Sequence, residues 1–306
     1  MHPAMVHRLS GHRGPVYALA VRGDRVLSGS GDGMVAAWGP DGVAGEALAQ
    51  VGQAVFALAV LDRHEALLIG TEGGDLHVVD LRDRREVQRL VLHRRGIFRI
   101  AALDEHRVAC AGGDGTLSVW SVLRREDGPR LTLQRQIPLV EEKLRDLAVN
   151  AVEGLVAVAC GDGSVRVLDR DDLNERQTLT GHAGGATSVA WHPRKPVLLS
   201  GGKDGHLRAW HAGHGAPLLA QAAHRAGIYA LAFDPQGLVL ASASRDKTAK
   251  LWRADDLEAE GRLDRAAGGH THSVNHLCWR GGRLFTGGDD RLVIEWSLSG
   301  GGIDGR

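Results

Sequence analysis

The chain has 306 residues, 43% of them hydrophobic, which is enough apolar material for one large core or two ordinary domains. Its 37 basic and 37 acidic residues balance, so composition gives no reason to expect nucleic acid or an anionic membrane as a partner. Three widely spaced cysteines, Cys110, Cys160 and Cys278, form no CxxC pair and argue against a disulfide framework.

The N-terminal stretch MHPAMVHRLSGH lacks the apolar core of a signal peptide, and no apolar run reaches membrane-spanning length. Forty-two glycines spread along the chain favour many tight turns over a flexible linker. We therefore expect a cytoplasmic protein with reduced cysteines and no membrane contact.

One plan recurs seven times along the chain. In Gly181–Trp210 a Gly-His pair precedes an apolar strand, a turn, a second strand, an Asp-Gly turn and a third strand. The third strands end, in chain order, at Trp38, Val79, Trp120, Leu168, Trp210, Trp252 and Trp296, at steps of 41, 41, 48, 42, 42 and 44 residues. Because the apolar residues alternate or form short runs, this period predicts the blades of a β-propeller.

The turn before each third strand has a recurring composition. Four units carry Asp-Gly, at Asp32-Gly33, Asp114-Gly115, Asp162-Gly163 and Asp204-Gly205. The other three carry Gly73-Gly74, Asp246-Lys247 and Asp290-Arg291. Asp-Gly favours type I′ hairpins, in which both central residues have positive φ, so we expect that turn here.

A fourth strand is expected after each of the first six third strands. These strands are Glu46–Gln50, Glu86–Leu92, Leu131–Ile137, Glu175–Leu179, Leu218–Ala222 and Leu257–Leu263. The seventh unit lacks one, whereas Met5–Leu9 precedes Gly11-His12 as Glu175–Leu179 precedes Gly181-His182. We therefore expect the first residues to complete the last blade, which leaves no open edge there. The longest step is explained by Arg124–Arg130, which we interpret as a solvated hairpin rather than a binding loop.

This joint pattern resembles the WD-repeat (WD40-type) β-propeller family. The resemblance implies an all-β, seven-bladed propeller with four antiparallel strands per blade, formed by a single domain at 5–298 and followed by a flexible Gly-rich tail at 299–306. It also implies structural tetrads made of a loop His, a second-strand Ser or Thr, a turn Asp and a third-strand Trp. The matching sets are His12, Ser28, Asp32, Trp38; His182, Ser200, Asp204, Trp210; His224, Ser242, Asp246, Trp252; and His270, Thr286, Asp290, Trp296.

Each tetrad is read as a buried polar network whose members need one another. The second unit has Val51, Ile69, Gly73 and Val79 at the four places, and the fourth has Val140, Val158, Asp162 and Leu168. We expect apolar packing in both and a turn role for Asp162. The third unit has His93, Asp114 and Trp120 but Cys110 in place of the hydroxyl, and we expect the thiol to substitute.

The same residues argue against chemistry. A Ser-His-Asp set suggests a hydrolase, but here it recurs in four blades with a Trp attached, and no Gly-x-Ser-x-Gly elbow is present. The His211/His214 pair and the His270/His272/His276 group have loose spacing for a metal site, and no phosphate-binding motif occurs. We expect no catalytic residue, no metal and no cofactor.

Four of the six Phe and Tyr residues share one register position, five residues after the loop His or its equivalent. The resemblance implies that this position begins the innermost strand and faces the narrow top face around the channel. The expected exposed ring is, in blade order, Tyr17, Phe56, Phe98, Arg145, Thr187, Tyr229 and Asn275. Lys203 and Arg245, each just before a turn Asp, should lie on the same face. The alternative is that the aromatic residues are core and plug the channel mouth.

These observations favour a non-enzymatic protein-interaction scaffold, monomeric on its own, that uses this ring. An aromatic arc beside a basic arc suits a partner protein segment with apolar and acidic residues. Two alternatives stay open. One is a catalytic or ligand-binding propeller, similar to a lactonase, that uses the central channel. The other is a purely structural subunit that uses blade edges in a larger assembly.

Overall fold

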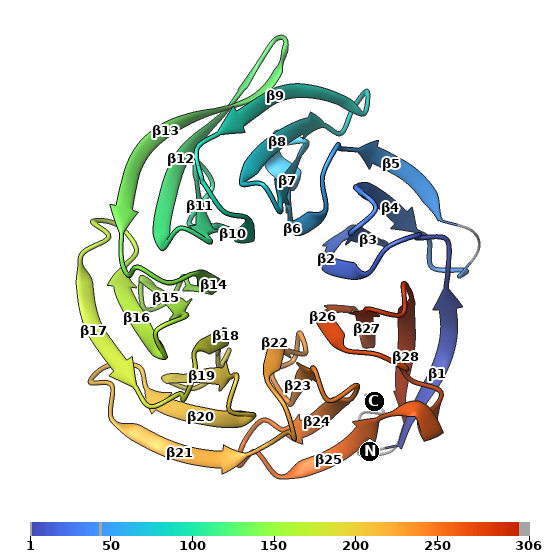
Figure 1. Ribbon diagram of the computed structural model, residues 1–306, viewed down its shortest axis with the longest axis vertical. Helices are drawn as coiled ribbons and strands as arrows, with labels where there is room; N and C mark the ends of the chain where they lie inside the picture. Colours follow the sequence, from blue (N-terminus) through green and yellow to red (C-terminus); the bar gives the residue numbers. More distant parts are fainter. Residues whose placement is uncertain (1, 43–44, 300–306) are drawn as a thin grey trace.

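The computed structural model describes residues 2–42 and 45–299. Among these residues the strands form seven four-stranded antiparallel sheets, arranged as a ring around a central channel (Figure 1). This confirms the all-β, seven-bladed propeller expected from the repeat. From residue 300 onward, the expected Gly-rich tail lies outside the described residues.

Each blade runs outward from the channel in four strands. The innermost strands are β2 (Val16–Arg22), β6 (Val55–Leu61), β10 (Ile97–Ala102), β14 (Leu144–Asn150), β18 (Ala186–Trp191), β22 (Ile228–Phe233) and β26 (Val274–Arg280). The second strands are β3 (Arg25–Ser30), β7 (Ala66–Thr71), β11 (Arg107–Gly112), β15 (Leu155–Cys160), β19 (Val197–Gly202), β23 (Val239–Ser244) and β27 (Arg283–Gly288).

The third strands are β4 (Met34–Trp38), β8 (Asp75–Asp80), β12 (Thr116–Arg125), β16 (Ser164–Asp169), β20 (His206–His211), β24 (Ala249–Arg253) and β28 (Val293–Ser299). The outer strands are β5 (Glu46–Gln50), β9 (Arg85–Val91), β13 (Gly128–Pro138), β17 (Glu175–Thr180), β21 (Pro217–Ala222), β25 (Ala259–Leu263) and β1 (His2–Leu9). Two short 3-10 helices, η1 (Asp62–His64) and η2 (Arg265–Ala267), lie in connections. No helix of the described part is long and apolar enough to cross a membrane.

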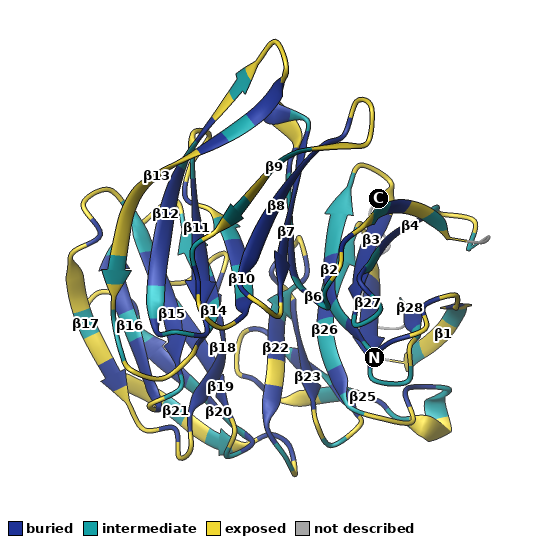
Figure 2. Ribbon diagram, turned by 45° about the horizontal axis from the view of Figure 1, so that its top comes forward, coloured by how far each residue is buried: buried dark blue, intermediate teal, exposed yellow. Residues whose placement is uncertain are grey.

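Burial follows the position of a strand within its blade. The second strands β7 and β23 are buried along their whole length, because the neighbouring blades cover both of their faces. Among the strands, the outer ones carry most of the exposed residues (Figure 2). The apolar core therefore lies between blades: Leu27 and Val35 of the first blade pack in one cluster with Leu67 and Ile69 of the second. Burying these side chains supplies the main driving force that closes the ring.

The last blade is closed by the first strand of the chain, as expected. Strand β1 pairs antiparallel with β28, and Leu9 lies opposite Val293 while Met5 lies opposite Trp296 (Figure 1). Leu9 is buried in the same cluster as Val16 and Trp38 of the first blade. The closing strand thus joins the last blade by backbone hydrogen bonds and the first blade by apolar packing.

The turns before the third strands differ from the expected type I′. Only the residue after the turn Asp has positive φ, as at Gly33 with 79°, Lys247 with 72° and Arg291 with 69°. The N–H of that residue donates to the carbonyl three residues earlier, as from Gly33 to Ser30 at 3.0 Å. The connection is therefore a β-turn followed by one residue in the left-handed conformation, which makes the hairpin loop longer than the two-residue loop of a type I′ hairpin. It leaves the Asp with negative φ and its carboxylate free to cap the following N–H groups, as Asp32 Oδ1 does for Met34 at 2.9 Å.

The tetrad side chains lie within hydrogen-bonding distance of one another in the four blades that carry complete sets. In the fifth blade, Trp210 Nε1 donates to Ser200 Oγ at 2.8 Å, and His182 Nε2 lies 2.8 Å from the same oxygen. His182 Nδ1 lies 3.2 Å from Asp204 Oδ1. The first, sixth and seventh blades repeat this arrangement around Ser28, Ser242 and Thr286, whose hydroxyl-bearing side chains are fully buried.

The third blade builds its network with a residue that the sequence comparison missed. His93 Nε2 lies 2.8 Å from Ser118 Oγ, and Trp120 Nε1 donates to the same oxygen at 2.9 Å. Ser118 lies on β12, directly opposite Cys110 on β11. The expectation that the thiol substitutes for the hydroxyl is therefore wrong: the hydroxyl is present, one strand further out. Burial raises the pKa of Cys110 to about 12, so the residue stays a neutral thiol.

The second and fourth blades fill the tetrad positions with apolar side chains, as expected. Val51, Ile69 and Val79 belong to one buried cluster, and Val158 and Leu168 to another. Asp162 caps its turn, accepting from the Ser164 N–H at 2.8 Å and from its hydroxyl at 2.7 Å.

The second blade also has a polar network that the sequence did not suggest. Gln53 accepts hydrogen bonds from the Thr71 hydroxyl and the Gly73 N–H, and it donates to Asp75. Arg89 closes this group with an ion pair to Asp75 at 2.6 Å.

The long third-to-fourth-strand hairpin is present in the third blade. Strands β12 and β13 extend to Arg125 and Gly128 and project beyond the ring (Figure 1). The hairpin is held against the second blade, because Arg124 forms an ion pair with Asp80 at 2.7 Å and donates to the His64 carbonyl.

Candidate functional site

The seven positions of the expected ring share one backbone feature. In every innermost strand the register with its neighbour shifts at this residue, so one extra residue is inserted at the start of the strand. The inserted residues are Tyr17, Phe56, Phe98, Arg145, Thr187, Tyr229 and Asn275. A bulge of this kind redirects a side chain out of the regular alternation of the strand. The shared register position is therefore also a shared local geometry around the channel mouth.

The residues that precede the turn Asp lie beside this ring. The Lys203 N–H donates to the Gly185 carbonyl at 2.9 Å, and the Arg245 N–H donates to the Gly227 carbonyl at 3.0 Å. The acceptor in each case lies two residues before the bulge residue of the same blade. The same bond is present in the other five blades, from Gly31, Glu72, Gly113, Gly161 and Asp289. We call the end of the propeller formed by these turns and the seven bulge residues the top face.

Three aromatic rings form a continuous arc on the top face. Tyr17 and Phe56 meet edge to face at 5.1 Å between ring centroids, and Phe56 stacks with Phe98 at 5.5 Å. The Arg145 guanidinium lies over the Phe98 ring at 4.8 Å, and Lys143 Nζ lies over it at 5.4 Å. All three rings are partly exposed. The rings of three adjacent blades thus act as one surface, which we call the aromatic arc.

The aromatic arc is continued by cations that have no carboxylate partner. Within residues 2–42 and 45–299, Lys143, Arg145, Lys203 and Arg245 take part in no ion pair, although most arginines elsewhere on the surface do. Burial and the like charges of Arg145, Arg95 and Lys203 lower the pKa of Lys143. Burial also lowers the pKa of Arg145. This clustering of like charge is unfavourable in the free protein and favours an anionic partner.

Two members of the expected ring behave differently from the rest. Thr187 is not exposed: it is 94% buried, and its hydroxyl donates to the carbonyls of Gly201 and Ile228. The expectation of an exposed residue is wrong here, because the short threonine side chain lies against the backbone of β19 and of β22 in the next blade, where its hydroxyl is satisfied. Asn275 is partly buried and tied down, donating to the Val16 carbonyl at 3.0 Å and to Asp289 at 2.7 Å. Tyr229, by contrast, is 36% exposed.

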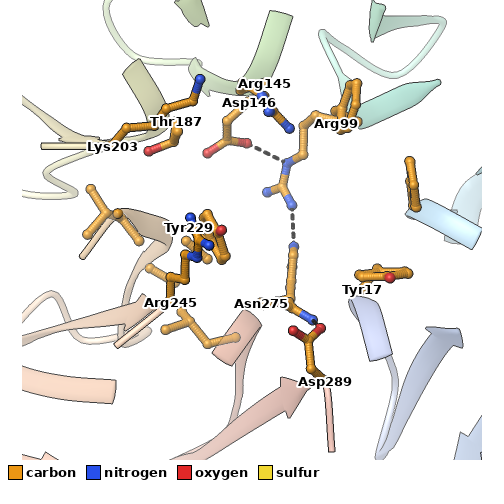
Figure 3. Close-up of a pocket in the computed structure, with 18 residues that line it drawn as sticks. Tyr17, Arg99, Arg145, Asp146, Thr187, Lys203, Tyr229, Arg245, Asn275 and Asp289 are labelled. Carbon is orange, nitrogen blue, oxygen red and sulfur yellow. Dashed lines mark hydrogen bonds and ion pairs between the residues drawn. The ribbon is translucent and has the colours of Figure 1, made fainter. Parts of the chain in front are cut away.

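A cavity of about 580 Å³ opens between these residues (Figure 3). Its walls include the aromatic arc on one side and Arg145, Lys203, Tyr229 and Arg245 on the other. Three further lining residues come from the innermost strands, and we call them the channel floor: Arg99, Asp146 and His276. They follow the bulge residues of the third, fourth and seventh blades by one position.

The channel floor is a polar bridge across the channel (Figure 3). Arg99 Nε lies 3.2 Å from Asp146 Oδ1, and Arg99 Nη1 lies 3.0 Å from His276 Nε2. Asp146 also accepts from the Val189 N–H of the fifth blade at 3.0 Å. Burial, with the charge of Arg99, lowers the pKa of His276 to about 3, and burial raises the pKa of Asp146. The floor therefore connects four blades and presents a neutral imidazole.

The channel floor was missed by sequence reasoning, although a signal was present. The position after the bulge residue is small in most blades, as at Ala18, Ala57 and Ala230, but holds charged or imidazole side chains in three. Three ionisable residues at a position that otherwise holds Ala or Ser, all facing one narrow channel, are an unusual set.

The side chains that could suggest catalysis or a metal site have structural surroundings. The tetrad serines and Thr286 are fully buried beneath the imidazoles, out of reach of a substrate. His211 and His214 stack at 3.9 Å between ring centroids, and His270 belongs to its tetrad. In the described part of the chain, no three His, Cys, Asp or Glu residues are grouped in a way that could hold a metal ion.

Comparisons with known proteins agree with this architecture. The family model described as WD domain, G-beta repeat, matches residues 4–39, 173–211 and 215–253. A solved structure of the WD40 β-propeller domain of Doa1 superposes with a TM-score of 0.84 and 20% sequence identity, covering 97% of each chain. That similarity is one of fold.

Curated relatives match parts of the chain at low sequence identity. WD repeat-containing protein 90 of Xenopus tropicalis is 25% identical over 64% of this chain and 12% of its own length. Protein TPR3 of Oryza sativa subsp. japonica is 25% identical over 78% of this chain and 19% of its own length. THO complex subunit 6 of Homo sapiens is 22% identical over 54% of this chain and 52% of its own length. The chain thus spans a minor part of the first two relatives and about half of the third.

Proposed function

The chain is a WD40-repeat, seven-bladed β-propeller, and we propose that it is a non-enzymatic scaffold that binds a segment of a partner protein on its top face. Members of this family generally act through protein interactions. The observation that carries the proposal is the combination at the channel mouth: an arc of three touching, partly exposed aromatic rings, continued by cations without carboxylate partners.

Both halves of this surface suit a protein partner. Aromatic residues at the centre of an interface contribute much of the binding energy, and unpaired cations at its edge select the partner by charge. A core role would cover the rings of the aromatic arc with apolar residues of neighbouring blades, whereas the same position holds Arg145 and Asn275 elsewhere. The expected partner is a segment with apolar and acidic residues, bound by a propeller that is monomeric on its own. We place this activity in the cytoplasm, where the three unpaired cysteines would stay reduced.

The test is a triple substitution in the aromatic arc, Tyr17→Ala, Phe56→Ala and Phe98→Ala. Affinity capture from the native organism should lose the partners that the wild type captures, while the melting temperature changes by only a few degrees. Each truncated interface aromatic should cost about 2 kcal/mol of binding free energy. Unfolding of the variant would show that the rings are core, and unchanged capture by a folded variant would place the interaction elsewhere, first at the Arg124–Arg130 hairpin.

A second candidate is a purely structural subunit of a larger assembly. The relative named THO complex subunit 6 favours it, since that protein is by its name a component of a complex. The two functions separate in the same experiment: a structural subunit that docks by its blade edges would stay in a high-molecular-weight fraction of native extract when the aromatic arc is removed.

A further inference from the structure

The cavity beside the aromatic arc is lined by more cationic than anionic side chains. Four cationic side chains line it, Arg99, Arg145, Lys203 and Arg245, against two carboxylates, Asp146 and Asp289. Both carboxylates already have partners within the protein, Arg99 and Asn275 respectively. The cavity is therefore left with a net charge of about +2 on its wall, which an incoming group could neutralise.

We propose that the cavity receives the carboxylates of acidic side chains from the bound segment, with Lys203 and Arg245 as their partners on the cavity wall. This inference rests on the proposed function and specifies its ligand. The apolar residues of the segment lie on the aromatic arc, and at least two Asp or Glu side chains enter the channel mouth beside it.

The geometry favours carboxylates over a phosphoryl group. Phosphate sites are usually built from several backbone N–H groups that converge on one point. Here the N–H groups of the top-face turns are already used, each donating to a carbonyl of its own blade, as from Lys203 and Arg245. The free cations come instead from separate blades, an arrangement that suits separate carboxylates.

The aromatic arc likewise disfavours a nucleic acid strand. Bases bind single-strand sites by stacking on free aromatic faces. Phe98 stacks with Phe56 and carries Arg145 over its ring, so its faces are engaged within the protein. Tyr17 meets Phe56 edge to face, which leaves ring edges and small apolar surfaces for aliphatic side chains.

The test uses a library of random twelve-residue peptides displayed on phage, fused so that every carboxylate comes from a side chain. The library is first depleted on the aromatic-arc triple variant and then selected on wild-type protein. Enriched segments are synthesised with blocked ends, and their dissociation constants are measured by fluorescence anisotropy. We expect enriched segments to combine apolar residues with two or more acidic ones.

Two matched protein variants locate the carboxylates. Lys203→Gln with Arg245→Gln removes two exposed cations of the cavity wall, and Arg95→Gln with Arg225→Gln removes two exposed, unpaired cations that do not line it. Replacing the key peptide Glu by Gln should weaken binding to the wild type and to the second variant about tenfold or more. On the cavity variant the same peptide change should cost less than about threefold.

The inference is overturned if the Glu-to-Gln change costs the same on all variants, or if a phosphoserine peptide or a single-stranded RNA binds more tightly than the acidic peptide. Arc-dependent segments without acidic residues would reject the inference and leave the proposed function standing. Failure to select any arc-dependent segment would reject both.

Discussion

The relocated hydroxyl of the third blade provides the sharpest test of the tetrad as a network. Replacing Ser118 by Ala removes one oxygen that two groups share, the Trp120 indole N–H and the His93 Nε2. Both groups are buried, and the thiol of Cys110, which lies beside Ser118 and Trp120, is only a weak hydrogen-bonding group. Leaving a buried polar group unpaired costs about 1–3 kcal/mol, so two such groups should lower the free energy of unfolding by about 2–6 kcal/mol.

The control is Cys110→Ala at the opposite position of the neighbouring strand. The thiol of Cys110 is fully buried, but the oxygen shared by the indole and the imidazole belongs to Ser118. Removing the thiol should therefore cost only about 1 kcal/mol of lost packing. In the other tetrads the hydroxyl stands at the position of Cys110, ten residues before the Trp. The double change Cys110→Ser and Ser118→Ala should therefore move the hydroxyl to the usual strand and recover at least half of the loss.

The measurement is urea unfolding of the four proteins, followed by tryptophan fluorescence. Midpoints are compared at equal m values, since a change in m would signal a change in cooperativity. Equal losses for Ser118→Ala and Cys110→Ala would refute the assignment of Ser118, and so would a double variant no more stable than Ser118→Ala alone.

Three further predictions concern stability. Deleting residues 1–10 removes β1 and buried Leu9 from the last blade and should lower the melting temperature by many degrees. Deleting the Gly-rich residues 300–306, which offer little apolar surface, should leave the melting temperature unchanged. Equal melting curves for the two deletions would contradict the closure of the last blade by β1. Trp210→Ala orphans Ser200 and His182 and should cost about 3–5 kcal/mol, while Asp162→Asn, in a blade without the network, should cost about 1 kcal/mol or less in the same urea assay. Burial lowers the pKa of His182, and hydrogen bonds lower the pKa of Asp204. In acid the unfolded chain therefore binds more protons than the folded chain does. The free energy of unfolding should fall as the pH drops below about 6.5, and it should fall further below about pH 4. A His182→Gln variant should show a shallower fall between pH 7 and 5, and an equal slope would show that His182 does not contribute to it.

The sequence by itself determined the architecture of this protein. The recurring Trp, Asp and Gly-His positions repeat at a nearly constant period, and a blade that cannot bury its faces alone must stack against its neighbours, so the period predicts a ring. The absence of a fourth strand in the last unit and the presence of an extra strand at the start likewise required closure by the first residues. The shared register of Tyr17, Phe56, Phe98 and Tyr229 marked the channel mouth before any coordinates.

Only the tertiary structure decided which side chains meet across blades. Ser118 replaces a hydroxyl that the register places at Cys110, because two strands face each other and either can supply the oxygen. Thr187 shares the ring position yet is buried, because its short side chain bonds to backbone carbonyls of β19 and of the next blade. The channel floor joins Arg99 to His276, 177 residues apart, and no local pattern encodes such a pair. Periodicity fixes where a residue lies within its blade, whereas contacts across the channel depend on how seven blades close into one ring.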